Sequence, residues 1–162
     1  LSLAAGIAVI DALRHLGVGG LGMKWPNDIL LDGRKLGGIL IEVSGEASGT
    51  CTLVIGIGIN LHIGEHDASL IDQPWIDLQQ ALGRSVDRNE LAAACLISLC
   101  AMLRDYPETG FEPWRDKWAG VDVLSGRQVV MTVHQCGPCI EGIAVGIDAG
   151  GGDWIFLLFI AE

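Results

Sequence analysis

No uninterrupted run of eighteen apolar residues occurs in this sequence, although half of its residues are hydrophobic. A helix that spans a membrane needs about twenty such residues, so no spanning segment is expected. Residues 1–17 are apolar but have no basic region at their start, and Asp11, Arg14 and His15 recur at helical spacing. This pattern favours an amphipathic helix over a secretory signal peptide.

Basic residues are also scarce, with 10 lysines and arginines against 20 acidic residues and a net charge of −10. Because no basic stripe is present to neutralise phosphates, nucleic acid is not expected as a partner. The five cysteines are an odd number, and Cys51, Cys95 and Cys100 lie in apolar periodic segments. They are interpreted as buried free thiols in a reducing compartment, which together with the charge predicts a cytoplasmic protein.

The first 119 residues combine helical and strand periodicity. A helical pattern covers residues 2–16, and strand patterns follow at 23–31, 36–43 and 50–60. The Asp-Gly pair at 32–33 is a strong signal for a two-residue hairpin turn between the first two strands. The third strand is apolar on both faces, which predicts a central position. This order predicts an α+β fold with helices packed on a mixed or antiparallel sheet.

Three more helices are predicted before residue 120, at 75–82, 91–106 and 111–118. Asp87 stands where an N-cap for the longest helix would lie, and Pro107 is expected to end that helix.

After Gly120 the pattern changes to short strands at 128–133, 140–147 and 153–160 with glycine and proline turns between them. Such spacing is typical of a small β-barrel or SH3-like module. The sequence therefore divides into a first domain, 1–119, and a second domain, 120–162.

The tetrapeptide Cys136-Gly137-Pro138-Cys139 matches the active-site motif of thioredoxins, where a helix follows the first cysteine. Here it stands between two strand patterns, which favours a Gly-Pro hairpin turn. A disulfide under oxidising conditions, or a metal held with His134, stays open as an alternative, although no fourth ligand is evident.

The segment from Lys24 to Asp28 carries the most distinctive chemistry. A strand delivers Lys24 into a turn stiffened by Pro26, after which Asn27 and Asp28 present an amide and a carboxylate. Lys35 returns on the next hairpin strand, so two lysines and a carboxylate are expected to converge. A positioned cation offsets the repulsion when a carboxylate attacks the α-phosphate of a nucleotide. A solvated hairpin with surface charges is the alternative.

Paired glycines at 37 and 38 interrupt the second strand ahead of Leu40, and the pattern Gly-Ile-Gly recurs at 56–58. Glycines inside a strand indicate either a close approach of ligand or backbone, or a β-bulge. The second set is no dinucleotide-binding fingerprint, because the spacing fails and no helix follows.

Two segments, KWPNDILLDGRKLGGILIE at 24–42 and VIGIGINLHI at 54–63, resemble the catalytic domain of biotin protein ligases in sequence, order and spacing. The resemblance extends to about residue 148. It implies the fold that biotin ligases share with class II aminoacyl-tRNA synthetases, followed by an SH3-like domain. It also implies a reaction in which biotin and Mg-ATP give biotinyl-5′-AMP, and a lysine of a biotin carboxyl carrier protein then displaces AMP.

The resemblance implies catalytic roles for three residues. Lys35 would contact biotin and the reacting phosphate, Lys24 would support the phosphates, and Asp28 would orient the acceptor lysine. No protein ligand for a metal is implied, so Mg²⁺ would enter with ATP. The other implied contacts are Asn27 for the adenylate, Gly38 and Leu40 for biotin, and Ile59 and Asn60 for the adenine side.

The sequence departs from the family in one respect that bears on activity: no glycine- and arginine-rich loop of the kind that closes over the ligand occurs in it. Because the chain enters its first helix at Leu1 without a cap, we expect it to be truncated at the N-terminus. The tail after Asp148 departs from the family pattern, so an incomplete barrel is expected. Without the loop, the chain is expected to bind ligand weakly on its own. A lipoate ligase-like enzyme and a non-catalytic remnant or binding module are the alternatives. A homodimer is left open.

Overall fold

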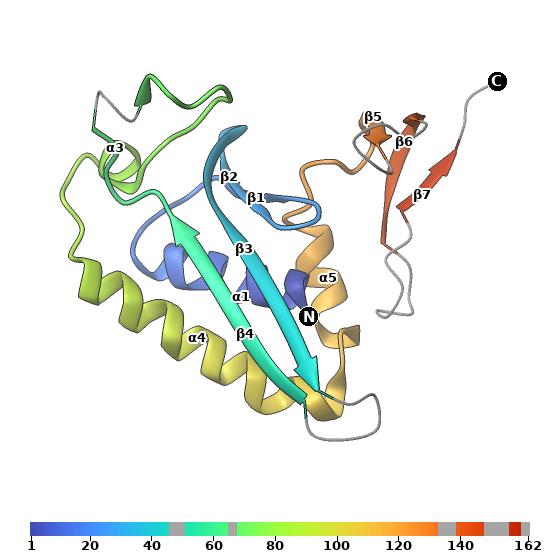
Figure 1. The fold of residues 1–162 in the computed structure, drawn as a ribbon, viewed down its shortest axis with the longest axis horizontal. Coiled ribbons are helices and arrows are strands. Elements are labelled where there is room, and N and C mark those ends of the chain that lie inside the picture. Colours follow the sequence, from blue (N-terminus) through green and yellow to red (C-terminus); the bar gives the residue numbers. More distant parts are fainter. Residues whose placement is uncertain (46–50, 65–67, 133–138, 148–155, 160–162) are drawn as a thin grey trace.

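The computed structural model describes residues 1–45, 51–64, 68–132, 139–147 and 156–159 (Figure 1). A four-stranded antiparallel sheet and the helices that cover one of its faces form the larger part, and a three-stranded antiparallel sheet follows. The elements are α1 (Ser2–His15), β1 (Leu21–Lys24), β2 (Asp28–Leu31), β3 (Arg34–Gly45), β4 (Cys51–Ile59), α3 (Leu78–Leu82), α4 (Arg88–Thr109), the 3₁₀ helix η1 (Glu112–Trp114), α5 (Arg115–Ala119), β5 (Gln128–Thr132), β6 (Cys139–Ile147) and β7 (Phe156–Phe159).

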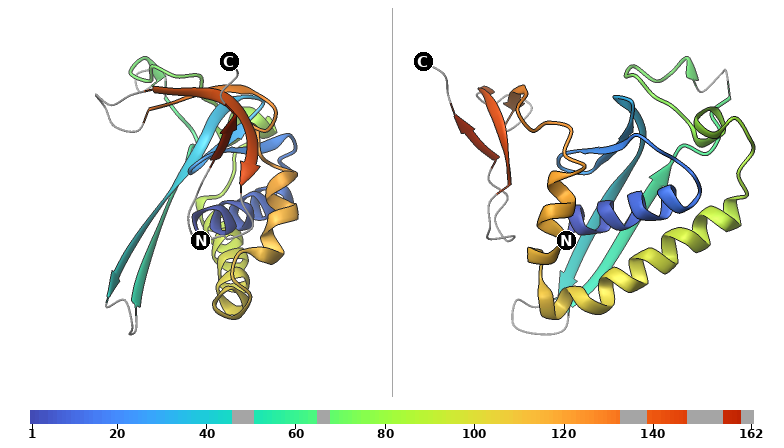
Figure 2. Two further views of the ribbon diagram at one scale, coloured as in Figure 1. Left: turned by 90° about the vertical axis from the view of Figure 1, so that its right-hand side faces the viewer. Right: turned by 180° about the vertical axis from the view of Figure 1, so that it is seen from behind.

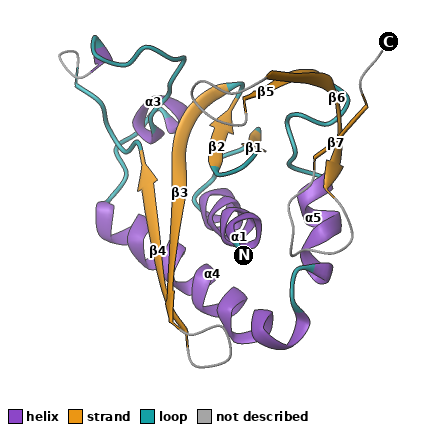
Figure 3. Cartoon of the chain, turned by 45° about the vertical axis from the view of Figure 1, so that its right-hand side comes forward, coloured by secondary structure: helices purple, strands orange, loops and turns teal. Residues whose placement is uncertain are grey.

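Helix α1 forms the centre of the core. It lies between the sheet and α4, with α5 alongside (Figures 2 and 3). The helix predicted at 2–16 is confirmed, but from Leu3 to Leu13 every residue except Asp11 is buried, so its apolar surface is wider than that of an ordinary amphipathic helix. Alanines between the large apolar residues allow neighbours to approach on several sides. Gly6 is the closest approach, because a Cβ there would collide with the Met23 side chain of β1.

The strands pair in the order β1-β2-β3-β4, each antiparallel to the next. The segment 23–31, predicted as one strand, instead folds back on itself as β1 and β2 around a cis Trp25–Pro26 peptide bond. The next hairpin forms as predicted, since Asp32 and Gly33 both take positive φ values of 49° and 75°.

Strand β4 is at the edge of the sheet in the described part of the chain, which corrects the central position predicted for it. Its residues 51–54 are exposed. The opposite edge is covered, because residues 121–123 run parallel to β1, with the Met23 amide donating to the Val121 carbonyl at 2.7 Å. Residues just after the predicted domain boundary therefore pair with the edge of the first sheet.

Helices α3 and α4 correct two predicted boundaries. Residues 74–76 are extended beside β3 instead of helical, and α3 begins only after its N-cap, Asp77. Asp87 caps α4 as predicted, accepting from the Asn89 amide at 2.7 Å. Pro107 lies inside the last turn of α4, and the helix ends at Gly110 with φ 61°.

The C-terminal strands β5, β6 and β7 form an open antiparallel sheet beside α5 (Figure 3). The described residues form no closed barrel, so the predicted SH3-like module is not confirmed. Residues 133–138, which include Cys136, lie outside the described residues; Cys139 opens a strand and not a helix.

The cysteine prediction is correct in part. Cys51, Cys95 and Cys100 are free thiols, but only Cys95 is buried. None of the described helices is long and apolar enough to cross a membrane.

Candidate functional site

The outer face of the sheet, opposite the helices, carries one row of predicted site residues. In the strand register Lys24 pairs with Asp28, Asp28 with Gly38, and Gly38 with Gly58. Residues directly opposite one another in an antiparallel sheet point to the same face. The adjacent row, which contains Met23 and Ile29, is buried against the core. Lys24 and Asp28 therefore lie on the other face of the sheet, away from α1. Figure 2 shows that α1 and α4 lie together on one side of this sheet.

Lys35 reaches this face because of a β-bulge. Ile29 pairs with Gly37 but Leu30 pairs with Lys35, so Leu36 is an extra residue on β3. Regular alternation from Gly38 would place Leu36 outside and Lys35 in the core. The bulge reverses both: Leu36 is fully buried, and Lys35 turns outward. Bulges commonly redirect a side chain next to a functional site in this way.

The redirected lysine pairs with the predicted carboxylate. Lys35 Nζ lies 2.7 Å from Asp28 Oδ1, and the two side chains are 32% and 21% exposed. A charge-assisted contact of this length in a half-buried setting holds the ammonium at a defined position. Lys24 is exposed, and among the described residues no ion pair involves it.

Asn27 is fixed by the neighbouring strand. Its Nδ2 donates to the Ile39 carbonyl at 2.8 Å, and the Ile39 amide donates to the Asn27 carbonyl at 3.0 Å. These bonds tie the turn after Pro26 to β3, so Asn27 and Asp28 are presented from a rigid backbone.

A shallow depression of about 390 Å³ lies among these groups. Its floor is largely bare backbone, because Gly38 and Gly58 face each other across β3 and β4 and Gly56 faces Leu40. A Cβ added at Gly58 would meet nothing within 4 Å, so the space above it is open. The depression is lined by Asn27, Asp28, Lys35, Gly38, Ile39, Leu40, Gly56, Ile57 and Gly58.

Two predicted residues do not join the depression. Ile59 pairs with Gly37 and lies on the inner face, where it lines a different cavity. Asn60 directs its Nδ2 to the carbonyls of Lys35 and Ile76, at 3.2 and 3.1 Å. Sequence reasoning noted Gly56 and Gly58 but did not place them on the site floor; their pairing with β3 reveals it.

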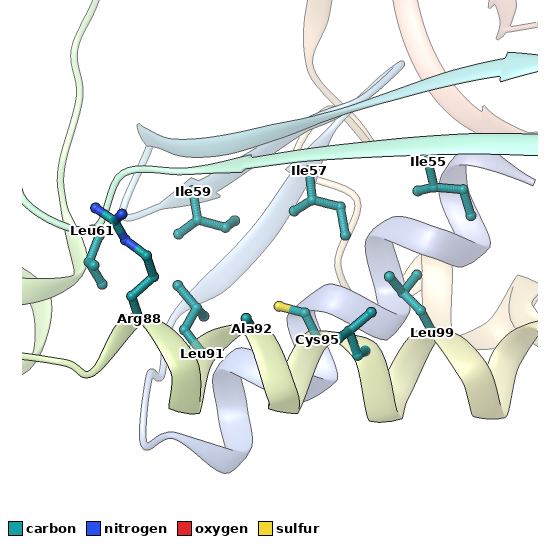
Figure 4. A pocket seen from close by; sticks show the side chains of 10 residues that line it. Ile55, Ile57, Ile59, Leu61, Arg88, Leu91, Ala92, Cys95 and Leu99 are labelled. Atoms are coloured by element: carbon teal, nitrogen blue, oxygen red, sulfur yellow. The ribbon is translucent and has the colours of Figure 1, made fainter.

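The inner cavity, about 500 Å³, lies between β4 and α4 (Figure 4). Isoleucines 55, 57 and 59 point from the strand toward Leu91, Cys95 and Leu99 of the helix. Burial raises the pKa of the Cys95 thiol, which disfavours its nucleophilic form. Arg88 is the one charged residue among the described residues of this lining, whereas the outer depression holds both Lys35 and Asp28.

Comparison with known proteins agrees with this geometry. Residues 2–60 match the model of the biotin/lipoate A/B protein ligase family, and that range holds the whole outer depression. Over these residues the chain is similar to this family, and its similarity to curated members extends over 93% of its length.

Its relatives in the family include biotin ligases. The chain is 39% identical over 151 residues to the bifunctional ligase/repressor BirA of Escherichia coli strain K12, covering 93% of this chain and 46% of that protein. It is 36% identical over 160 residues to the biotin–[acetyl-CoA-carboxylase] ligase of Paracoccus denitrificans, covering 93% and 64%. The chain thus spans about half the length of the first relative and under two thirds of the second.

A solved structure shares the fold. The biotin protein ligase of Aquifex aeolicus in complex with biotin and ATP superposes with a TM-score of 0.74 at 26% identity, covering 91% of this chain and 60% of that one. The α+β arrangement of helices on the sheet is therefore similar to that of the biotin protein ligase catalytic domain.

Proposed function

We propose that the outer depression binds biotin and ATP, forms biotinyl-5′-AMP, and presents it to a lysine of a biotin carboxyl carrier protein. The observation that carries the proposal is the Lys35–Asp28 pair at 2.7 Å beside a glycine floor. Biotin ligases among the relatives, and an Aquifex aeolicus ligase solved with biotin and ATP, support this choice within the family.

In the first step, a carboxylate oxygen of biotin attacks the α-phosphorus of ATP. The new P–O bond forms as the bond to the β-phosphate breaks, and pyrophosphate leaves. Both reactants are anionic, so Lys35 stabilises the arrangement by moving from Asp28 to the oxygens between them. Lys24, in the same row, adds a second cation for the phosphates. Gly38 and Leu40 support the biotin ring and chain, and Asn27 contacts the adenylate.

In the second step, the acceptor lysine nitrogen attacks the acyl carbon. An amide bond forms, the acyl–oxygen bond breaks, and AMP leaves. Once Lys35 has moved to the phosphate, the Asp28 carboxylate is free to accept a hydrogen bond from the incoming amine and to orient it. The ion pair between Asp28 and Lys35 therefore keeps both groups in place until the adenylate separates them.

Magnesium is proposed to arrive as the ATP complex. Among the described residues no group of three His, Cys, Asp or Glu side chains could hold an ion. Asp28 is the carboxylate of the depression, and its Oδ1 is already paired with Lys35. We propose that the residues of the depression hold the substrate phosphates, and that the phosphate oxygens bind the Mg²⁺. A cytoplasmic location and a homodimer stay predictions.

Isothermal titration calorimetry on the chain with biotin, biotinyl-5′-AMP, lipoate and lipoyl-AMP tests the proposal. Binding of biotinyl-5′-AMP in preference to lipoyl-AMP supports it, and the reverse preference favours the lipoate alternative. Binding without pyrophosphate release from ATP and biotin indicates a non-catalytic module. If no ligand binds, the proposal fails for this chain. A thiol-redox function would instead require insulin reduction that is lost in Cys136→Ser.

A further inference from the structure

The direction of Lys35 depends on the bulge at Leu36, and a bulge needs support from its surroundings. An extra residue breaks the ladder between β2 and β3, so the backbone groups of Lys35 and Leu36 cannot all find partners in a regular sheet. Buried backbone groups without partners are costly, which means that other segments must bind them. The partners come from Asn60 and from residues 74–76.

Asn60 follows the last paired residue of β4 and binds both residues at the bulge. Its backbone amide donates to the Leu36 carbonyl at 2.8 Å, and its side-chain Nδ2 donates to the Lys35 carbonyl at 3.2 Å. The same Nδ2 donates to the Ile76 carbonyl at 3.1 Å. One side chain therefore joins the bulged strand to the extended segment beside it.

The segment 74–76 completes the arrangement around Lys35. The Lys35 amide donates to the Pro74 carbonyl at 2.9 Å, and the Ile76 amide donates to the Lys35 carbonyl at 3.0 Å. Asn60 also accepts, through its carbonyl, from the Leu78 amide at 2.8 Å. The backbone of Lys35 is thus held on the side opposite β2 by groups that Asn60 ties together.

We propose that Asn60 is a positioning residue, which holds the bulge that turns Lys35 toward Asp28 and so acts on the reaction through Lys35. The catalytic part of this inference rests on the proposed function; the positional part does not. The chemistry requires a side chain with two donor hydrogens directed at two carbonyls, which an asparagine amide supplies and an aspartate does not. Nδ2 is committed to this task, whereas Oδ1 stays available as an acceptor, so the nucleotide contact predicted for Asn60 stays a prediction beside the positioning role.

The positional part can be tested by labelling lysines. The chain has three, Lys24, Lys35 and Lys117, whose rates of acylation by a succinimidyl ester can be resolved by mass spectrometry. Because Asp28 holds its ammonium, Lys35 is expected to react several times more slowly than the exposed Lys24 in the natural chain. In Asn60→Asp, which has the same shape but cannot donate, the ratio of Lys35 to Lys24 rates is expected to rise about threefold or more. An unchanged ratio in the folded variant would overturn the proposal.

Two further variants control this experiment. Asn89→Asp makes the same chemical change at an exposed position of α4, and it should leave the ratio of rates unchanged. If Asn60→Asp does not fold, Asn60→Ser retains one donor and is expected to give an intermediate ratio. Should both variants fail to fold, amide hydrogen exchange of the natural chain decides. Lys35 and Ile76 amides that exchange as fast as exposed loop amides would refute the hydrogen-bonded arrangement of Asn60 and residues 74–76 around Lys35.

Action through Lys35 is tested by coupling in biotinyl-5′-AMP affinity. Because part of the effect of Asn60 passes through Lys35, the double variant Asn60→Asp with Lys35→Ala should lose less affinity than the product of the two single losses. If the two losses multiply in full, Asn60 acts independently of Lys35, and the proposal is wrong. If the natural chain binds no adenylate, the proposed function fails while the labelling result still decides the positional role.

Discussion

Two glycines of the sheet, Gly37 and Gly58, are expected to respond differently to substitution by alanine. One substitution should lower stability, and the other should weaken ligand binding. They lie on adjacent strands but on opposite faces. A Cβ at Gly37 would collide with the Gly58 carbonyl oxygen and lie 2.7 Å from Ile59 Cδ1. A Cβ at Gly58 would meet nothing within 4 Å, but it would stand on the floor of the depression.

The expected magnitudes follow from these contacts. Overpacking a core costs about 1–3 kcal/mol, and the upper end applies to Gly37→Ala because one obstacle is backbone that cannot rotate away. For a domain of this size, about 3 kcal/mol lowers the melting temperature by roughly 6–12 °C. Gly58→Ala should leave stability unchanged or raise it by up to about 1 kcal/mol, since alanine loses less backbone entropy in a strand.

Urea unfolding followed by tryptophan fluorescence measures the first effect, and calorimetry with biotinyl-5′-AMP measures the second. Gly37→Ala should unfold at clearly lower urea than Gly58→Ala, whereas Gly58→Ala should fold normally and lose about tenfold or more in ligand affinity. Equal stability of the two variants would refute the assignment of the faces. Undiminished affinity in Gly58→Ala would show that the ligand does not lie on the glycine floor.

Three other outcomes are expected. Lys35→Ala should reduce adenylate formation by about a hundredfold or more, because it removes the positioned cation. Pyrophosphate release measures this effect, with Lys117→Ala as the control, and near-normal release would reject the role of Lys35. Asp77→Asn should lower the free energy of unfolding, measured in urea, by about 2 kcal/mol. The buried carboxylate accepts from the Ile63 amide at 2.9 Å and the Gln80 amide at 2.8 Å, and a side-chain amide has only one oxygen. Unchanged stability would contradict this. Because burial raises the pKa of the Cys95 thiol, iodoacetamide at mildly alkaline pH should alkylate Cys95 more slowly than the exposed Cys51 and Cys100. Peptide mapping measures the three rates, and equal rates would argue against the burial of Cys95.

Features that depend on a few adjacent residues could be predicted from the sequence. The turn at Asp32 and Gly33 forms because these residue types accept positive φ, and Asp87 caps α4 because its carboxylate reaches a free amide two residues on. The segment 24–42 was sufficient to predict the family and the meeting of Lys35 with Asp28, because the motif keeps those residues on one hairpin.

Features that depend on distant partners could not be predicted. The burial of α1 on several sides follows from where α4 and the sheet lie, and helical periodicity in one segment carries no information about that. The edge position of β4 depends on which strands are present beside it, so an apolar sequence alone suggested a central strand. Among the described residues the C-terminal strands form a three-stranded sheet and no closed barrel, so the SH3-like module stays a prediction; strand spacing does not determine whether a sheet closes on itself.

By itself, the sequence determined which chemical groups this protein brings to its site, since the spacing within 24–42 fixes them on neighbouring strands. Only the tertiary structure decided where Lys35 points. Side chains alternate along a strand with a period of two, so a single bulged residue, Leu36, moves the lysine from the core to the outer face. That bulge is held by hydrogen bonds from Asn60 and from residues 74–76, which are distant in the chain and adjacent only after folding.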